Sequence, residues 1–225
     1  MEKRHFDIEL EGLKQRLLLM AAKVEKIIEN SIEALRKRNR GLAEDILSWD
    51  REVDRLEIEI EERVISLIAT HQPAAGDLRF LIGALKINND LERIGDHGVN
   101  IAQSAIRLSD QPEIKPLIDI PRLSRASIDM LKESLNSFVD NDPERARTVC
   151  LRDDEVDALK DQIFRELLTF MMEKPSIISR AMELILVSRN LERIADLATN
   201  ICEETIYIAE AKVIKHHAEE AAPDK

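Results

Sequence analysis

Two near-identical acidic motifs are the residues of this chain best able to do chemistry. Residues 91–96 read Leu-Glu-Arg-Ile-Gly-Asp, and residues 191–196, one hundred positions later, read Leu-Glu-Arg-Ile-Ala-Asp. Residues spaced by four lie about one turn apart on the same side of a helix, so the two acids of each motif repel and weaken a bare helix by roughly 0.2–0.5 kcal/mol. Because this unfavourable arrangement occurs twice, it indicates a positive partner for the carboxylates. The two acidic pairs are Glu92 with Asp96 and Glu192 with Asp196.

A second pair of acids precedes each motif and indicates that the chain is a duplication. Asp50-Arg-Glu-Val-Asp54 corresponds to Asp153-Asp-Glu-Val-Asp157, at an offset of 103 residues. The offset falls to 100 at the two motifs, after a proline in each copy, and a length change confined to a turn is what a duplicated fold tolerates. The predicted organisation is a first helical domain at 1–110, a linker at 111–120, a second helical domain at 121–216 and a disordered C-terminal tail at 217–225.

The composition favours a helical protein and excludes several classes of function. Gly and Pro number only six and seven among 225 residues, and aromatic residues make up 3%, while the dominant residues are good helix formers. The net charge of −11 argues against nonspecific binding to nucleic acid or to an anionic membrane. No stretch approaches the ~18–20 apolar residues of a membrane span, and the N-terminus lacks the apolar region of a signal peptide. We therefore expect a cytoplasmic protein without direct membrane insertion, with Cys150 and Cys202 reduced.

Polar breaks divide the chain into six helices. Three prolines between residues 109 and 121 mark the linker between the repeats. Asp142 and Pro143 suit a helix start, with Asp142 as the N-cap and Pro143 at the first helical position. No segment shows the alternation of a strand, so the sequence predicts an all-α fold of two tandem antiparallel three-helix bundles. The predicted helices span about 7–39, 42–71, 77–108, 121–140, 143–173 and 177–215.

The helical periodicity brings the acids of each repeat toward one another. On a helical wheel, Glu92 and Glu192 fall within the apolar stripes of their helices, and Asp96 lies on the shoulder of its stripe. The upstream acids lie on a flank of the preceding helix, so four carboxylates converge in each repeat if the two helices align. An unpaired buried carboxylate is costly and needs a cation, a proton or a hydrogen-bond partner. Two turns further on, Asn100 and Asn200 can each add an amide oxygen.

Four converging carboxylates form a hard-oxygen site that suits Mg²⁺, Mn²⁺, Ca²⁺ or oxygen-bound iron. The alternative is a set of Arg–carboxylate pairs, because Arg93 and Arg193 adjoin the acids. His97 has Leu197 as its counterpart and lies away from Glu92 on the wheel, so we predict a surface or interhelix residue rather than a ligand. The Glu-x-x-His pattern of di-iron oxidases is absent, as are a phosphate loop, a zinc motif and a nucleophile elbow. These absences favour a protein that is not an enzyme.

The repeats and their motifs resemble the PhoU family of phosphate-transport regulators. The most specific strings are residues 89–102 and 189–201, and the likeness in repeat length, helix order and motif pairs covers essentially the whole chain. The resemblance implies a cytoplasmic, homodimeric helical protein with no established catalytic activity. It also implies two partners, the ATPase subunit of the phosphate ABC transporter and a phosphate-sensing histidine kinase. Such a protein modulates phosphate uptake and acts as a negative regulator of the phosphate-starvation response.

The resemblance further implies metal ions at the two acidic sites, with iron, manganese or magnesium as the candidates. Two other interpretations stay open beside a metal-binding signalling adaptor. One is a metalloenzyme with a carboxylate-bridged iron or manganese centre, and the other is a metal-free helical scaffold whose arginines neutralise the acids. Carried over by position, the metal ligands are Asp50, Asp54, Glu92, Asp96 and Asn100 in the first repeat, and Asp153, Asp157, Glu192, Asp196 and Asn200 in the second.

Overall fold

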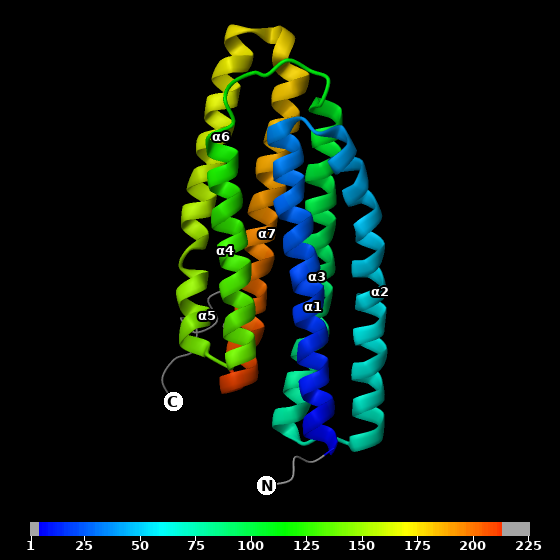
Figure 1. Ribbon diagram of the computed structural model, residues 1–225. Helices are drawn as coiled ribbons and strands as arrows, with labels where there is room; N and C mark the ends of the chain where they lie inside the picture. Colours follow the sequence, from blue (N-terminus) through cyan, green and yellow to red (C-terminus); the bar gives the residue numbers. More distant parts are fainter. Residues whose placement is uncertain (1–4, 213–225) are drawn as a thin grey trace, which may run out of the picture.

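Long helices make up most of the chain, as the composition predicts. The computed structural model describes residues 5–212. Within this range the fold consists of seven α-helices and one short 3₁₀ helix, with no strand (Figure 1). In chain order the elements are α1 (His5–Lys37), α2 (Arg40–His71), α3 (Ala75–Leu108), α4 (Asp119–Asp140), α5 (Pro143–Cys150), α6 (Asp153–Glu173), η1 (Pro175–Ile177) and α7 (Ile178–Glu210).

The predicted all-α, six-helix architecture is confirmed, with one interruption. The helix expected at 143–173 is divided into α5 and α6 by a turn at Leu151 and Arg152. Neither residue is a helix breaker, so the sequence carried no signal for this turn. The start of α5 is as predicted, because the Asp142 side chain accepts a hydrogen bond from the backbone N–H of Arg145 at 3.0 Å. The helix predicted at 177–215 ends earlier, because α7 stops at Glu210 and Ala211 adopts the left-handed conformation. The predicted tail at 217–225 falls outside the described residues.

Each repeat forms one three-helix bundle, and the two bundles lie side by side (Figure 1). The first contains α1, α2 and α3, and the second contains α4, the α5–α6 pair and α7. Buried residues recur every three or four positions, as in the α2 series Val53, Leu56 and Ile60. This spacing presents one apolar face of each helix to the core. The acids next to these residues are consequently held on the flanks of the bundles.

The third helices of the two bundles, α3 and α7, pack against each other along the middle of the molecule. They run antiparallel, and polar pairs bridge them at three levels. Because the central pair lies next to both acidic motifs, the two motifs occupy the same level of the molecule. The bridging pairs are Lys86 Nζ with Glu204 Oε2 at 2.9 Å, His97 Nδ1 with Asn190 Oδ1 at 2.9 Å, and Arg107 Nε with Glu183 Oε1 at 2.7 Å.

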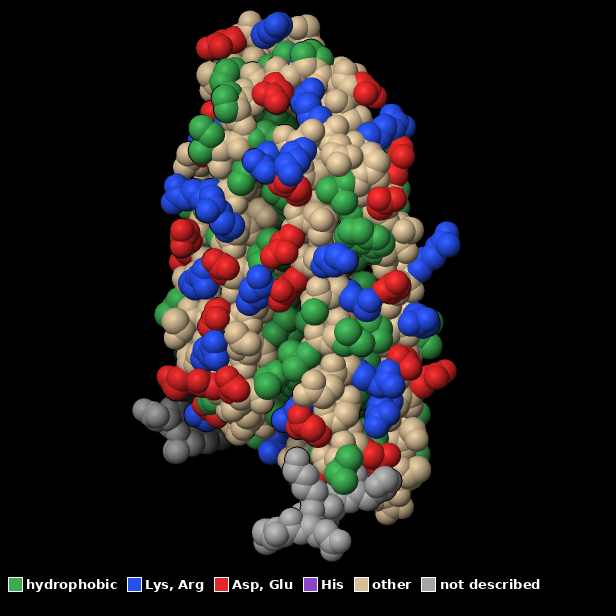
Figure 2. Space-filling model, in the orientation of Figure 1, with side chains coloured by type: hydrophobic (Ala, Val, Ile, Leu, Met, Phe, Trp, Pro, Cys, Tyr) green, Lys and Arg blue, Asp and Glu red, His purple; other side chains and the backbone are tan. Residues whose placement is uncertain are grey.

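The face of the molecule drawn in Figure 2 is densely charged, with acidic and basic side chains interspersed. On this face the described residues form no extended basic area for a polyanion, and the net charge of the chain is −11. Among the described residues, none of the helices combines the length and the apolar character that crossing a membrane requires.

Candidate metal centre

The first acidic site lies between α2 and α3, where the repeat was predicted to bring four carboxylates together. Asp50 and Asp54 project from α2 beside buried Val53, and Glu92 and Asp96 project from α3. Asp50 and Glu92 are half-buried, whereas Asp54 and Asp96 are exposed. Glu92 thus lies at the edge of the core rather than fully inside the apolar stripe. A carboxylate at this edge keeps access to water while facing its neighbours.

The electrostatics of the first site show that its carboxylates converge. Burial raises the pKa of Asp50, and the negative charges of Asp54 and Asp96 raise it further. Burial likewise raises the pKa of Glu92, with added repulsion from Asp96, Glu57, Asp54 and Asp50. The charges that shift these two groups are all negative. The site therefore holds an uncompensated concentration of negative charge.

Glu57 is a fifth member of this site that the sequence analysis did not identify. Its pKa is raised by burial and by the charges of Glu61, Asp54 and Asp96. Glu57 follows Asp54 by three residues, a spacing that also places side chains on one side of a helix. The spacing that places Glu57 beside Asp54 was therefore present in the sequence, but a search limited to acids spaced by four residues does not find it.

Cations do not neutralise the first site within the part of the chain that the structure describes. None of its five carboxylates, from Asp50, Asp54, Glu57, Glu92 and Asp96, takes part there in an ion pair or a side-chain hydrogen bond. Arg93, the predicted neutralising residue, instead contacts Asp90 at 3.4 Å. The arginine-paired alternative does not describe this repeat.

The second acidic site lies between α6 and α7 and repeats the convergence. Burial raises the pKa of Asp153 to about 6, followed by the negative charges of Asp196, Asp157, Asp154 and Glu192. These neighbours come from both helices, so Asp153 faces the acids of α7 across the interface. The four predicted carboxylates of the second repeat are thus brought together as well.

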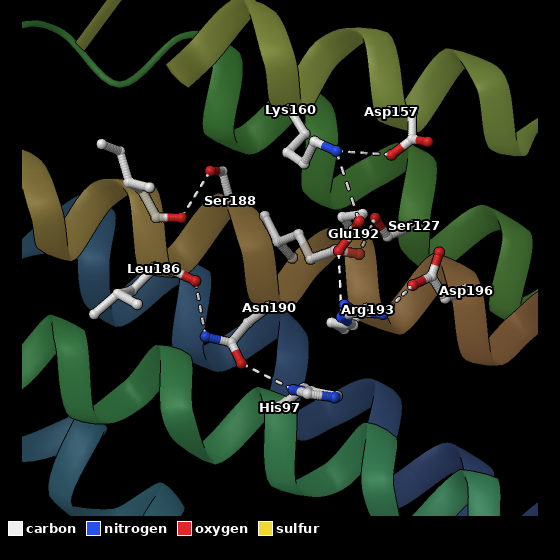
Figure 3. A network of polar contacts seen from close by, with 12 residues as sticks. His97, Ser127, Asp157, Lys160, Leu186, Ser188, Asn190, Glu192, Arg193 and Asp196 are labelled. Atoms are coloured by element: carbon white, nitrogen blue, oxygen red, sulfur yellow. Dashed lines mark hydrogen bonds and ion pairs between the residues drawn. The ribbon is translucent and has the colours of Figure 1, made fainter. Parts of the chain in front are cut away.

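Unlike the first site, the second site contains its own cations (Figure 3). Lys160 Nζ lies 3.1 Å from Asp157 Oδ1 and 3.6 Å from Glu192 Oε1. Arg193 Nη1 lies 2.9 Å from Asp196 Oδ2, and its Nε lies 3.6 Å from Glu192 Oε2. The arginine-paired alternative therefore holds in part for this repeat, with a lysine added that the sequence analysis did not consider.

Comparison with known proteins shows that the two segments containing the acidic sites match the same family model. The family model described as "PhoU domain" matches the chain twice, at residues 17–105 and 120–205. The chain belongs to the PhoU family. Each matched segment contains one acidic site, so the duplication seen in the sequence is a duplication of PhoU domains.

Relatives of known name match over nearly the whole chain. A "Phosphate-specific transport system accessory protein PhoU homolog" of Aquifex aeolicus is 44% identical over 208 residues, which cover 92% of this chain and 94% of that protein. A homolog of the same description from Clostridium acetobutylicum is 40% identical over 215 residues, which cover 95% and 98%. These names describe accessory proteins of transport rather than enzymes, and the prediction of a non-enzymatic protein is confirmed at the level of the family.

Solved PhoU structures have the same fold. The crystal structure of PhoU from Pseudomonas aeruginosa matches with a TM-score of 0.89 at 36% identity, covering 92% of this chain and all (100%) of that one. The phosphate transport system regulatory protein PhoU from Streptococcus pneumoniae matches with a TM-score of 0.88 at 26% identity, covering 94% and 100%. The two-bundle architecture is therefore shared across PhoU proteins of distant bacteria.

Among the described residues, the predicted asparagine ligands make no hydrogen bond with the carboxylates that would mark them as part of the two sites, and His97 pairs with another helix. Asn100 is exposed on α3 and makes no side-chain hydrogen bond among the described residues. Asn200 lines a groove of 440 Å³ between α3 and α7, together with Arg93, Arg193 and Asp196. A ligand role for the two asparagines thus stays a prediction. His97 bridges to Asn190 on α7, which confirms its predicted interhelix position.

The donor chemistry of the first site fits a hard cation, although its side chains are not arranged around one. Among residues 5–212, no group of three or more His, Cys, Asp or Glu side chains is positioned to hold a metal ion. Carboxylates that repel one another settle apart, and rotation about their side-chain bonds is needed to bring the oxygens to ligand distance. The first site offers five oxygen-bearing acids without bound cations. The second offers four, of which three already form ion pairs.

Proposed function

We propose that this protein is a metal-binding accessory and regulatory protein of phosphate-specific transport. The PhoU domains at residues 17–105 and 120–205, and the near-complete coverage of named accessory proteins, support the role in transport. We infer that it acts as a negative regulator of the phosphate-starvation response and modulates phosphate uptake. Its proposed partners are the ATPase subunit of the phosphate ABC transporter and a phosphate-sensing histidine kinase, and its proposed state is a cytoplasmic homodimer.

One observation carries the metal-binding part of the proposal. At the first site, Asp50, Asp54, Glu57, Glu92 and Asp96 bring five carboxylates together with no ion-paired cation among the described residues, and burial and repulsion raise the pKa of three of them. A folded protein seldom concentrates charge of one sign without compensation. Iron, manganese and magnesium all accept carboxylate oxygens. A bound ion supplies positive charge there and links α2 to α3.

In this proposal the half-buried and the exposed carboxylates contact the ion from different sides. Asp50 and Glu92, which are half-buried, sit closest to the packed faces of α2 and α3, and the exposed Asp54 and Asp96 border the solvent side. A Cβ atom built at Gly95 of α3 lies 3.8 Å from Asp50 Oδ1 of α2, an ordinary contact distance, so the two helices pass close to each other at this level. The carboxylates of the two helices are thereby kept within reach of one another.

Elemental analysis of protein purified without chelator tests the metal claim. We expect iron, manganese or magnesium in near-stoichiometric amounts, lost when Glu92→Gln and Glu192→Gln are combined. Trace metal only, with unchanged stability in the double variant, contradicts the claim and leaves the metal-free scaffold. Oxygen consumption or hydrolysis by the metal-loaded protein revives the metalloenzyme alternative instead.

The partner claim has a separate test. Co-purification of the transporter's ATPase subunit and of the histidine kinase with the full-length chain is expected. A chromosomal deletion is expected to switch on a phosphate-starvation reporter in phosphate-rich medium. Repression that persists in the deletion strain rules out the regulatory role.

A further inference from the structure

The two acidic sites differ in charge at one corresponding position. At the offset that aligns Asp54 with Asp157, Glu57 of the first repeat corresponds to Lys160 of the second. Both follow the second acid of their helix by three residues, so both lie on the same side of it. The structure confirms this placement, since Glu57 faces the first acidic cluster and Lys160 faces the second. A negative charge in one site is thus replaced by a positive charge in the other.

Lys160 reaches from α6 toward the acid on α7 (Figure 3). Its ammonium group is 3.1 Å from Asp157 Oδ1 on its own helix and 3.6 Å from Glu192 Oε1 on α7. The lysine side chain is 26% exposed and that of Glu192 is 15% exposed, so this bridge is partly shielded from water. An amine in this position occupies the region that an ion must enter to contact both helices.

Arg193 restrains the same carboxylate from the other direction. It contacts Glu192 Oε2 at 3.6 Å and Asp196 Oδ2 at 2.9 Å. The second site therefore combines four acids with two ion-paired cations, whereas the first combines five acids with none among the described residues. Asp153 is the one acid of the second site outside these ion pairs, which leaves that site some residual attraction for a cation.

We propose that Lys160 is a built-in cation that lowers the metal affinity of the second site, so that metal fills the first repeat before the second. This inference rests on the proposed function, in which the acidic sites bind metal. A dication entering the second site must approach a fixed ammonium group or displace it from Asp157 and Glu192, and either change opposes binding. The two PhoU domains then respond to different metal concentrations.

Titration of the metal-free, full-length protein with Mn²⁺ by isothermal calorimetry tests this order of filling. Wild-type protein is expected to show a tight and a weak class of site, separated by at least about tenfold in Kd. Glu92→Gln is expected to remove the tight class, and Glu192→Gln the weak one. Lys160→Gln is expected to tighten the weak class by about tenfold or more. Lys174→Gln, which removes a lysine charge at the end of α6 away from the acids, is the matched control and leaves both classes unchanged.

The possible failures are distinguishable. The role of Lys160 is overturned if the two sites of the wild-type protein bind Mn²⁺ with equal affinity. It is also overturned if Lys160→Gln leaves the affinity of the weaker site unchanged. In both cases metal binding itself stands. No Mn²⁺ binding by any variant overturns this inference, and elemental analysis of protein purified without chelator decides separately whether the metal-binding function fails with it. Circular dichroism of each variant before titration checks that a variant which has lost a class of binding site is still folded.

Discussion

Glu57 on α2 and Lys160 on α6 occupy the same position of the two repeats, and they give two otherwise similar acidic sites opposite local chemistry. Burial raises the pKa of Glu57, and the negative charges of Glu61, Asp54 and Asp96 raise it further. Around Lys160 burial lowers the pKa, but the hydrogen bond to Asp157 and the charges of Asp157, Glu192 and Asp161 raise it by more. Duplication supplied two copies of one site, and this position is one at which the charges of the two copies are opposite.

Glu57→Lys is expected to make the first site resemble the second in its local charge and in its affinity for Mn²⁺. The new ammonium group lies within reach of Glu92 and Asp96, whose charges it partly neutralises. We expect the Kd for Mn²⁺ at the first site to rise by at least about tenfold, because a fixed positive charge a few ångströms away opposes a dication. The rise in melting temperature on adding Mn²⁺, measured by differential scanning fluorimetry, is expected to shrink in parallel.

The control for this substitution is Glu62→Lys, which makes the same charge change on another side of α2. Glu62 does not figure among the charges that shift the acids of the first site. A general effect of net charge predicts equal loss of Mn²⁺ binding in both variants, and that result contradicts a local role for position 57.

Helical periodicity predicted most of the fold, because apolar residues at spacings of three and four define one buried face. The duplication then predicted which acids meet, since corresponding positions of two repeats must pack alike. The turn at Leu151 and Arg152 escaped prediction because neither residue carries a helix-breaking signal. A glycine or proline there would have marked it.

The side-chain partners were less predictable than the helices. Arg93 and Arg193 occupy the same motif position, yet Arg93 contacts Asp90 and Arg193 contacts Asp196. Long flexible side chains choose among several acids within reach, and the choice depends on tertiary placement that periodicity does not fix. The contribution of Lys160 depends in the same way on how α6 lies against α7.

Gly98→Ala is expected to destabilise the first bundle. A Cβ atom at this position lies 2.6 Å from Cγ2 of buried Ile27, and 3.5 Å from the backbone nitrogen of Ile28. Because Cγ2 is attached directly to the β-carbon, it cannot swing aside without moving α1. We expect a loss of about 1–3 kcal/mol in the free energy of unfolding, measured by urea denaturation. Gly76→Ala is the matched control, since nothing lies within 4 Å of a Cβ atom there, and an equal loss in both variants contradicts the packing explanation.

Lys86→Met is expected to weaken the contact between the two bundles. Lys86 Nζ lies 3.1 and 2.9 Å from the two carboxylate oxygens of Glu204, whose side chain is only 2% exposed. Removing the ammonium group takes a hydrogen-bonding partner from a buried carboxylate and is expected to cost about 1–3 kcal/mol. Adding Glu204→Gln is expected to recover part of the loss in a double-mutant cycle measured by urea denaturation. Strict additivity of the two changes shows instead that the pair is not coupled.

Neutralising the corresponding glutamates of the two sites is expected to change stability in opposite directions in metal-free protein at pH 7. Glu92 is surrounded by repelling carboxylates, so Glu92→Gln removes repulsion and is expected to raise the free energy of unfolding by about 0.5 kcal/mol. Glu192 contacts Lys160 and Arg193, so Glu192→Gln removes attraction and is expected to lower it by about 0.5–1 kcal/mol. Urea denaturation in the presence of a chelator measures both. Shifts of the same sign show that the two sites are electrostatically alike, whereas opposite signs show that the second repeat carries its own counter-ions and the first does not.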